Sequence, residues 1–374
     1  MKKLVALLLV LTLSLGLCAN AFAFFEDPVE RPETIDVLGM NGDACGWYTD
    51  LMLTEEEKEQ VRGMGLSLAY EMPNESEFSQ GVLTGLQSVC DDLNIEIAGL
   101  AVCENDPAVQ KENLENFMAL GVDYVVSQAQ EVDIAAESYD PLRDAGIKLI
   151  FQGNYPTGYQ AGVDCLPSQN EDFASYGILC ADALAAALNY EGKVAAITMS
   201  AVNQVANTRD DAFVERIQTY ENIELVEVAG IEVVSDTGTV ASALLTRHPD
   251  LDGLYCTFVE PATEALEAVR GLNMTDLKIV TNDFNSMAVL DMVQGGNMCA
   301  FAVDRPMVLG QLLGVIAACD AVGKEFEYSS YLNPVTLATV DNLEEEWKGG
   351  FGTDLPAEIK TVLDERTAAA TEAE

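Results

Sequence analysis

The chain has 374 residues, with 19 Lys and Arg against 62 Asp and Glu, which gives a formal net charge of −43 at pH 7. A surface this acidic repels nucleic acid and anionic lipid head groups, so we expect neither as a partner. The length exceeds what one hydrophobic core usually supports, so two domains are expected.

The first 23 residues have the pattern of a secretory signal peptide. Lys2 and Lys3 precede an apolar stretch that runs from Leu4 to Leu17, and Ala23 ends a small-x-small pattern of the kind that signal peptidase requires. The stretch is shorter than the roughly twenty residues of a stable transmembrane anchor. Cys18 ends a segment that partly matches a lipobox, so a lipid anchor at Cys18 is an alternative. We expect export, to the periplasm or to the outer face of the cell membrane.

Residues 24–65 form an acidic arm that is predicted to contain one short helix. Thr54 and Glu57 have the spacing of a capping box, with Thr54 as the N-cap and Glu57 reaching back to it. Trp47 and Tyr48 have two interpretations. They form an aromatic lid over a ligand, or they pack the arm onto its domain, and the second interpretation is favoured.

From Leu66 onward, short apolar runs alternate with segments of helical period. The spacing of about 25–30 residues is that of right-handed βαβ units, whose buried parallel strands read as nearly continuous apolar runs. The fold class is therefore α/β. The predicted strands are residues 66–72, 95–102, 124–127, 148–151, 194–199, 225–228, 254–258 and 279–281.

A polar, Gly- and Pro-containing stretch at residues 158–170 interrupts this alternation. Four βα units precede it and about four follow it, which predicts two similar doubly wound parallel-sheet lobes. In such an arrangement a ligand binds in the cleft at the carboxyl ends of both sheets. The Ala-, Thr- and Glu-rich tail, residues 366–374, is expected to be disordered.

Several short phrases after Leu66 occur in an order and spacing that resemble the ribose-binding branch of type I periplasmic binding proteins. The phrases are Phe78-Ser79 before Gly85, Gly121 to Val126, Arg209 before Phe213, His248 to Tyr255, and Thr281-Asn282-Asp283. The resemblance implies a three-segment hinge near residues 165–168, 304–306 and 332–335. It also implies an N-terminal lobe of residues 66–165 plus 306–332 and a C-terminal lobe of residues 168–303 plus 335–365.

The same resemblance, together with the chemistry of sugar binding, selects candidate ligand-binding residues. Sugars are bound by planar polar side chains and by aromatic surfaces, and such residues follow several of the predicted strands. Arg209 is predicted at a helix start, capped by Asn207 or Thr208, where its loss would leave the fold intact. The candidates are Phe78, Ser79, Gln128, Asn154, Arg209, Phe258, Asp283 and Asp304.

Two of these positions depart from the family's pattern. Gly153-Asn154 stands where the family has an Asp-Arg pair, and Phe258 stands where it has Asn. Arg209 and Asp283 match the ligand-binding Arg and carboxylate of the family. A ligand other than ribose is therefore expected.

These features predict a solute-binding protein that captures a sugar or polyol by hinge closure and delivers it to a membrane ABC permease. A sensor component for a membrane receptor or kinase is an alternative, and a secreted glycoside hydrolase using Asp283 and Asp304 is a third. The sequence contains one His, His248, and lacks G-x-S-x-G and Walker motifs, so we expect no enzyme activity, no cofactor and no metal. We expect a monomer.

Overall fold

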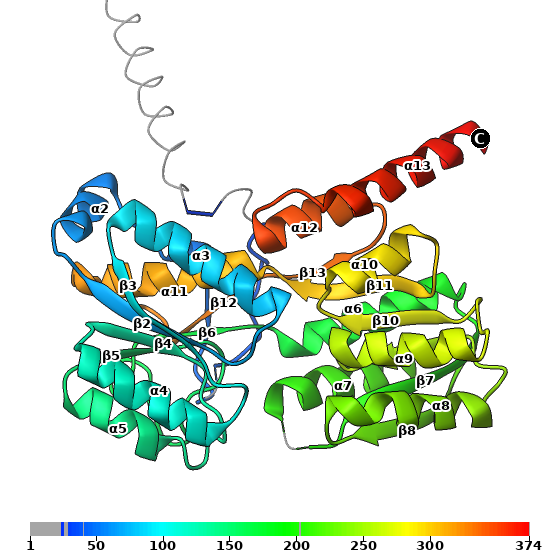
Figure 1. The fold of residues 1–374 in the computed structure, drawn as a ribbon, viewed down its shortest axis with the longest axis horizontal. Helices are drawn as coiled ribbons and strands as arrows, with labels where there is room; N and C mark the ends of the chain where they lie inside the picture. The colour runs from blue at the N-terminus through cyan, green and yellow to red at the C-terminus, as the bar shows by residue number, and fades with distance from the viewer. Residues whose placement is uncertain (1–23, 26–28, 40, 202, 374) are drawn as a thin grey trace, which may run out of the picture. The chain divides into compact units, whose positions relative to one another are not determined.

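A computed structural model describes residues 24–25, 29–39, 41–201 and 203–373 (Figure 1). The predicted signal peptide, with Cys18 in it, lies outside the described residues. The chain divides into two compact units and passes from one to the other three times. Unit 1 is Met1–Asn170 with Pro306–Asn333, and unit 2 is Glu171–Arg305 with Pro334–Glu374.

Unit 1 is built on a parallel sheet with helices on both faces. Helices α3 and α11 cover one face and helices α4 and α5 cover the other (Figure 1). Apolar side chains on the two faces form two clusters, which is the pattern expected of a doubly wound sheet. In the order of the sheet, its strands are β3 (Glu96–Val102), β2 (Ser67–Met72), β4 (Tyr124–Ser127) and β5 (Lys148–Phe151), and its helices are α3 (Glu77–Leu93), α4 (Pro107–Leu120), α5 (Ala136–Asp144) and α11 (Pro306–Ala321).

The N-terminal arm packs onto unit 1. Its strand β1 (Gly46–Trp47) pairs with β12 (Ser330–Leu332), which in turn pairs with β6 (Ser168–Asn170). Trp47 and Tyr48, the latter in η1 (Tyr48–Asp50), are buried in the core of the unit, so they anchor the arm and do not form a lid. Helix α2 (Glu55–Arg62) begins with the predicted capping box of Thr54 and Glu57, which is confirmed.

Unit 2 is built on a mixed sheet that also has helices on both faces. Helices α6 and α7 pack on one face, and α8 and α9 pack on the other. The sheet is parallel except for its edge strand β13, which is antiparallel to β11. In the order of the sheet, its strands are β13 (Val335–Ala338), β11 (Met298–Asp304), β10 (Lys278–Asn282), β9 (Gly253–Cys256), β7 (Gly192–Met199) and β8 (Ile223–Ile231). Its helices are α6 (Phe173–Ala187), α7 (Gln204–Ile217), η2 (Val234–Asp236), α8 (Thr237–Arg247), α9 (Val259–Gly271), α10 (Ser286–Val293), α12 (Leu343–Phe351) and α13 (Ala357–Ala373).

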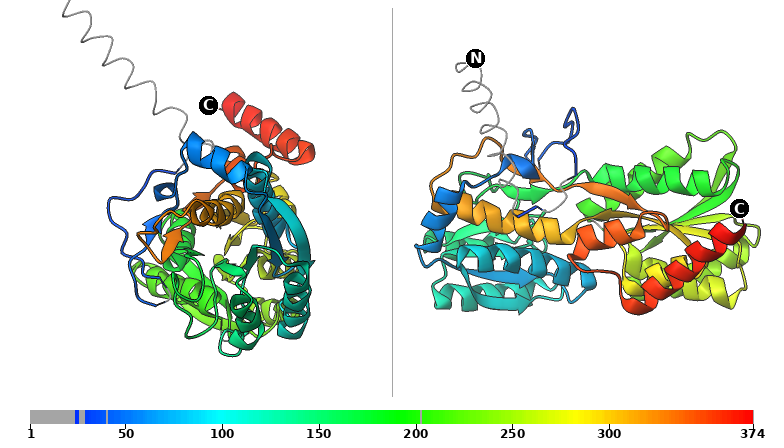
Figure 2. Two further views of the ribbon diagram at one scale, coloured as in Figure 1. Left: turned by 90° about the vertical axis from the view of Figure 1, so that its left-hand side faces the viewer. Right: turned by 90° about the horizontal axis from the view of Figure 1, so that it is seen from above.

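The C-terminal tail differs from its prediction. Residues 366–373, expected to be disordered, continue helix α13, which lies beside α10 (Figure 2). Alanine has the highest helix propensity of all residues, so the Ala-rich composition that suggested disorder also favours a helix. Arg366 fixes the start of this segment, since its Nη1 donates a hydrogen bond to the carbonyl oxygen of Met292 over 2.6 Å.

The α/β fold class with parallel sheets is confirmed, and each predicted strand corresponds to an observed one. Strand β11 and the short strands β1, β6, β12 and β13 were not predicted. All eight described cysteines are free thiols, and all but Cys299 are buried. Within the described residues, no helix combines the length and the apolar composition needed to cross a membrane.

Candidate functional site

The candidate residues of unit 2 gather at the carboxyl edge of its sheet. Strands β9, β10 and β11 are adjacent and parallel, so their carboxyl ends meet at one edge. Asp283 directly follows β10, Asp304 is the last residue of β11, and Phe258 lies two residues after β9. This edge therefore brings together side chains that are far apart in sequence.

The backbone of Asp283 leaves strand β10 in a left-handed conformation, with φ of 61°. Asp and Asn tolerate this region better than most residues, although it still costs free energy. The backbone N–H of Asp283 donates to the carbonyl oxygen of Ala302 over 2.8 Å, which ties the turn to strand β11. The turn fixes the carboxylate at the sheet edge, with 21% of the side chain exposed.

Arg209 is held against two carboxylates and one aromatic ring. Its Nη1 lies 3.4 Å from Oδ2 of Asp283, and its Nη2 lies 3.4 Å from Oε2 of Glu171. The guanidinium stacks on the ring of Tyr176, with Cζ 3.8 Å from the ring centroid. The hydroxyl of Tyr176 donates to Oε2 of Glu171 over 2.7 Å, so the ring and the acid are themselves connected.

Two expectations about Arg209 are wrong. Helix α7 begins earlier than predicted, because Asn203 is the N-cap and its Oδ1 accepts a hydrogen bond from the N–H of Ala206. Arg209 therefore lies in the second turn, not at the start. Its residue exposure is 8%, so it is a buried ion-pair partner, and its removal would leave buried carboxylates without their cation.

Asp304 is the most deeply buried of the candidate carboxylates, with 2% of the residue exposed. Its Oδ2 has no hydrogen-bond partner among the described residues, and the same holds for Oδ1 of Asp283. Burial raises the pKa of Asp304 well above its usual range, and the negative charges of Glu171 and Asp283 raise it further. A proton on Asp304 thus relieves part of the repulsion in this cluster.

The charges of the cluster act on one another. Burial raises the pKa of Asp283 and the charge of Arg209 partly offsets that increase, while Glu171 adds to it. Burial by itself would lower the pKa of Arg209, but the surrounding Tyr176, Asp283 and Glu171 raise it above its ordinary value. Arg209 therefore stays protonated, whereas burial favours the neutral form of Asp283 and Asp304.

Glu171 and Tyr176 complete the cluster and were not predicted from the sequence. Glu171 lies just after the polar stretch that was interpreted as a linker between lobes. Tyr176 lies in α6 and is buried in the core of unit 2. An acidic residue directly after the first predicted crossing was the available signal, because that position also borders the carboxyl edge of the sheet.

In unit 1, Gln128 and Asn154 follow adjacent strands, β4 and β5, at the carboxyl edge of that sheet. Their loops are joined, because the carbonyl oxygen of Asn154 accepts a hydrogen bond from the N–H of Ala129 over 3.0 Å. The carbonyl oxygen of Gln128 accepts from Nε2 of Gln110 over 3.0 Å. Both residues are partly exposed, and neither side-chain amide is hydrogen-bonded to another described residue. Two amides are therefore presented at this edge.

Phe78 and Ser79 lie in the first turn of α3, which follows β2 at the same edge. Phe78 is partly buried against the core of unit 1. Ser79 is buried, and its hydroxyl donates to Oδ1 of Asn74 over 3.3 Å while its N–H donates to the N-cap hydroxyl of Ser76. The hydroxyl of Ser79 thus has a local structural partner.

Phe258 is the N-cap residue of α9 and is partly exposed, without a side-chain capping bond. Behind it, the hydroxyl of Tyr255 donates to Oδ1 of Asp210 over 2.8 Å. The amide of Asn282 donates to that same hydroxyl over 2.9 Å and to the carbonyl oxygen of Thr257 over 2.7 Å. This buried network connects the ends of β9 and β10 and gives the carboxyl edge a rigid base.

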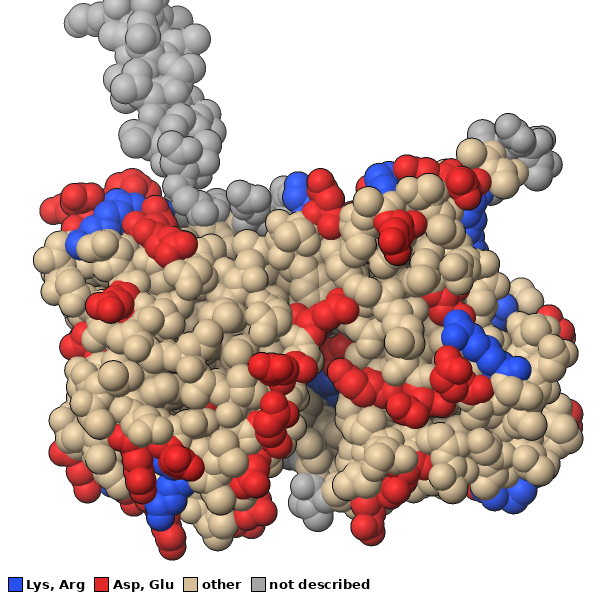
Figure 3. Space-filling view, viewed as in Figure 1, with Lys and Arg blue, Asp and Glu red and all other residues tan. Residues whose placement is uncertain are grey.

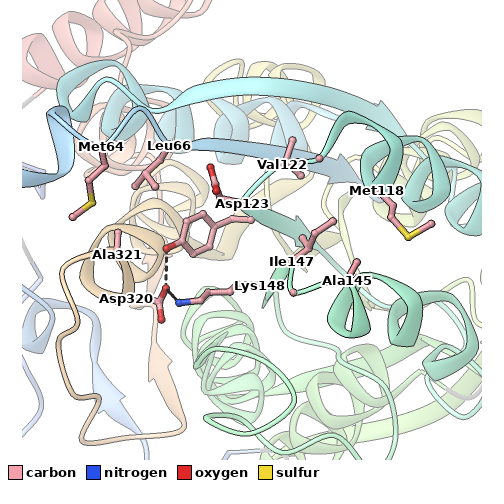
Figure 4. Close-up of a pocket in the computed structure, with 13 residues that line it drawn as sticks. Met64, Leu66, Met118, Val122, Asp123, Ala145, Ile147, Lys148, Asp320 and Ala321 are labelled. Carbon is pink, nitrogen blue, oxygen red and sulfur yellow. Dashed lines mark hydrogen bonds and ion pairs between the residues drawn. The ribbon is translucent and has the colours of Figure 1, made fainter.

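A cavity of about 550 Å³ lies in unit 1 but at the opposite edge of the sheet (Figure 4). Tyr124 and Lys148, the first residues of β4 and β5, line it. The Tyr124 hydroxyl donates to Oδ2 of Asp320 over 2.8 Å, and Lys148 pairs with the same carboxylate. Since Gln128 and Asn154 follow the other ends of these strands, this cavity is separate from the candidate residues.

His248 has a structural role. It is the C-cap residue of α8, and its Nε2 lies 2.9 Å from Oε2 of Glu227. Within the described residues, no group of three or more His, Cys, Asp or Glu side chains has the arrangement of a metal site.

Comparison with known proteins places the chain in a family. The family model described as "Periplasmic binding protein domain" matches residues 70–325. A Rhizobium meliloti protein named as a rhizopine-binding protein is 26% identical over 266 residues, which cover 68% of this chain and 82% of that protein.

Solved structures share the fold. An ABC transporter solute-binding protein from Bacillus halodurans with bound myo-inositol has a TM-score of 0.65 at 19% identity, over 76% of this chain and 98% of that one. One from Agrobacterium vitis bound with α-D-tagatopyranose has a TM-score of 0.67 at 18% identity, over the same shares. Because the family model covers more than half of the sequence, the chain belongs to the periplasmic binding protein domain family, whose members bind substrates outside the cytoplasm and are not enzymes.

Proposed function

We propose that this protein captures a sugar or polyol outside the cytoplasm and delivers it to a membrane ABC permease. The observation that carries the proposal is a group of side chains that we call the Arg209 cluster. In it the Arg209 guanidinium meets carboxylates at the carboxyl edge of a largely parallel sheet, and its members are Glu171, Tyr176, Arg209, Asp283 and Asp304. Side chains of this kind are multidentate partners for adjacent hydroxyl groups. The family assignment supports the same function.

The ligands of the solved relatives agree in chemical class. They include myo-inositol, α-D-tagatopyranose and, in a protein from Mycobacterium smegmatis with a TM-score of 0.65 and 22% identity over 74% of this chain and 95% of that one, glycerol. All three carry several hydroxyl groups. We carry over the class and not any one ligand, since the identities of these relatives lie at 18–22%.

Ligand-contacting residues are proposed for each unit by itself. The amides of Gln128 and Asn154 donate to and accept from hydroxyl groups, and Phe78 and Phe258 offer apolar surface to the C–H groups of a ring. Ser79 supports the start of α3 through its bond to Asn74. The charged residues are Arg209, Asp283 and Asp304.

The remaining parts of the proposal concern the chain as a whole. Residues 1–23 act as a signal peptide, with lipidation at Cys18 as the alternative route to the outer face of the membrane. The two lobes are residues 66–165 plus 306–332 and residues 168–303 plus 335–365, and the protein acts as a monomer. It has no catalysis of its own, since Asp283 is ion-paired with Arg209 and suits a hydroxyl acceptor better than a nucleophile.

Isothermal titration calorimetry tests the proposal, with purified protein titrated against pentoses, hexoses, linear polyols and inositols. We expect tight binding of at least one member of this panel and no binding of amino acids or nucleosides. The opposite result, tight binding of an amino acid or nucleoside and of nothing in the panel, would show that the sugar or polyol class is wrong.

A further inference from the structure

A buried hydrogen-bond network in unit 1 centres on the carboxylate of Glu71 in β2. Glu71 is 1% exposed. Its Oε2 accepts hydrogen bonds from Nε2 of Gln110 over 2.7 Å and from the hydroxyl of Ser127 over 2.8 Å. Its Oε1 accepts from Nδ2 of Asn113 over 3.1 Å. Donors from α4 and β4 therefore satisfy this buried carboxylate.

Gln110 connects this network to the loop of residues 128–130, which follows β4. Its Nε2 also donates to the carbonyl oxygen of Gln128 over 3.0 Å, and its Oε1 accepts from the N–H of Gln130 over 2.9 Å. Gln110 is 2% exposed, and together with the bond to Glu71 its side-chain amide is engaged both as a donor and as an acceptor. One buried side chain thus holds the backbone of the loop on both sides of Ala129.

The start of helix α4 holds Gln110 itself in place. Asp106 is the N-cap of this helix, and its Oδ1 accepts hydrogen bonds from the N–H groups of Ala108 and Val109. The N–H of Gln110 donates to the carbonyl oxygen of Asp106 over 2.9 Å. The side-chain amide of Gln110 is therefore carried by a capped helix start, which is a stable support for a loop.

We propose that Gln110 is a positioning residue for ligand binding, which sets the conformation of the 128–130 loop and thereby the position of the Gln128 side-chain amide. The inference rests on the proposed function and adds to it a residue that acts through Gln128. The Gln128 amide has no hydrogen bond to another described residue, so the backbone that carries it decides where its donors and its acceptor lie. A loop that is already ordered costs no ordering entropy when the ligand binds, which raises the affinity.

The variant Gln110→Met tests the proposal, because Met fills a similar space but offers no N–H donor and only a weak acceptor. The probe is the panel of pentoses, hexoses, linear polyols and inositols. We expect each member that binds the unmodified protein to bind the variant about tenfold more weakly, the worth of about one net hydrogen bond. In the unliganded variant the N–H of Gln130 should exchange with deuterium about tenfold faster, since its acceptor is gone. Calorimetry and NMR-detected hydrogen exchange measure the two effects.

Asn113→Leu is the matched control, because it removes another donor to Glu71 from the same helix. The Nδ2 of Asn113 donates to Glu71 and to a backbone carbonyl oxygen of β3, and neither bond involves the 128–130 loop. Both variants should lower the midpoint of urea unfolding, since each leaves the buried carboxylate one donor short. Asn113→Leu should leave the affinity and the exchange rate of the Gln130 N–H unchanged, whereas a purely structural role of Gln110 would make the two variants alike.

The possible results separate this inference from the proposed function. If the panel binds Gln110→Met as tightly as the unmodified protein, or if Asn113→Leu loses as much affinity, the positioning role is wrong while sugar or polyol capture stands. Should Gln110→Met not fold, it is combined with Glu71→Gln, which removes the buried charge, and is compared with Glu71→Gln alone, with the same tenfold loss expected. If no member of the panel binds the unmodified protein, both proposals fail.

Discussion

At the residue scale, Arg209 connects the fold of unit 2 to its candidate site. The guanidinium lies on the ring of Tyr176 and reaches Glu171 and Asp283 with two different nitrogens. Its Nε has no hydrogen-bond partner among the described residues, although it is buried. A planar, forked cation is thus fixed in orientation by the protein, with its Nε–H among the donors that remain for a ligand.

Replacing Arg209 by Lys should weaken ligand binding by about tenfold, because Lys keeps the charge but loses the fork and the stacking on Tyr176. Arg209→Ala should also lower the free energy of unfolding, by about 3–5 kcal/mol, since it leaves buried carboxylates without their cation. The measurements are calorimetric titration and urea unfolding. Arg216→Lys is the control, an arginine on the same helix that pairs with Asp182 and should bind ligand as the unmodified protein does. Unchanged affinity in Arg209→Lys would remove Arg209 from the site.

At the element scale, the candidate site depends on how closely α6 and α7 approach each other. Gly177 of α6 makes this approach possible, because a Cβ there would lie 2.1 Å from the carbonyl oxygen of Arg209 and 2.5 Å from the nitrogen of Phe213. Both of those atoms belong to the backbone of α7 and cannot turn aside. The same contact places the Arg209 side chain over Tyr176, one residue before Gly177.

Gly177→Ala should therefore push α7 away from α6. We expect the free energy of unfolding to fall by about 1–3 kcal/mol, the usual cost of overpacking, and ligand affinity to fall with it as Arg209 moves. Urea unfolding and calorimetry measure the two effects. Gly238→Ala in α8 is the matched control, since its Cβ would contact only Oε2 of Glu264 at 3.7 Å. That variant should be neutral or more stable by up to about 1 kcal/mol. An equally stable Gly177→Ala would mean that the two helices separate without cost.

At the scale of the whole molecule, the net charge of −43 acts on stability as well as on partners. Acidic side chains are spread over both units on the face shown in Figure 3, with few Lys or Arg among them. Below the surface, burial raises the pKa of several carboxyl groups. Burial raises the pKa of Asp210 from 3.8 to about 6, although the N–H of Met199 and the hydroxyl of Tyr255 donate hydrogen bonds to it.

Stability should rise when the pH is lowered from 7 to 5. A group whose pKa is raised by folding binds more protons in the folded state, so its stabilising contribution is full below the unfolded pKa and is lost as pH rises through the folded one. For Asp210 that window runs from 3.8 to about 6, and the gain between pH 7 and pH 5 is about 1 kcal/mol. The raised pKa values of Asp283 and Asp304 act in the same direction.

Urea unfolding of the unliganded protein at several pH values measures this effect, because urea does not screen charge. Asp210→Asn should reduce the gain between pH 7 and pH 5 by about 1 kcal/mol, since it removes the titrating group. A lower free energy of unfolding at pH 5 than at pH 7 would contradict the prediction.

The sequence by itself determined the fold class and the positions of the main strands. Residues 124–127 and 148–151, for example, were predicted with the bounds that β4 and β5 have. Both strands are buried on two faces, so their apolar runs are local signals that need no tertiary context. Strand β11 was missed although its residues are also largely apolar.

The site was only partly determined by the sequence. Asp283 was predicted because it follows a strand that periodicity reveals, and Asp304 because the family resemblance places it at a crossing between the lobes. Glu171 and Tyr176 were not, since their proximity to Arg209 follows from the packing of α6 on α7 and not from any local pattern. The burial of Arg209, and with it the cost of removing the residue, was likewise decided by tertiary structure. Residues separated by tens of positions meet there because parallel strands bring their carboxyl ends to one edge, and burial at that edge sets their charges.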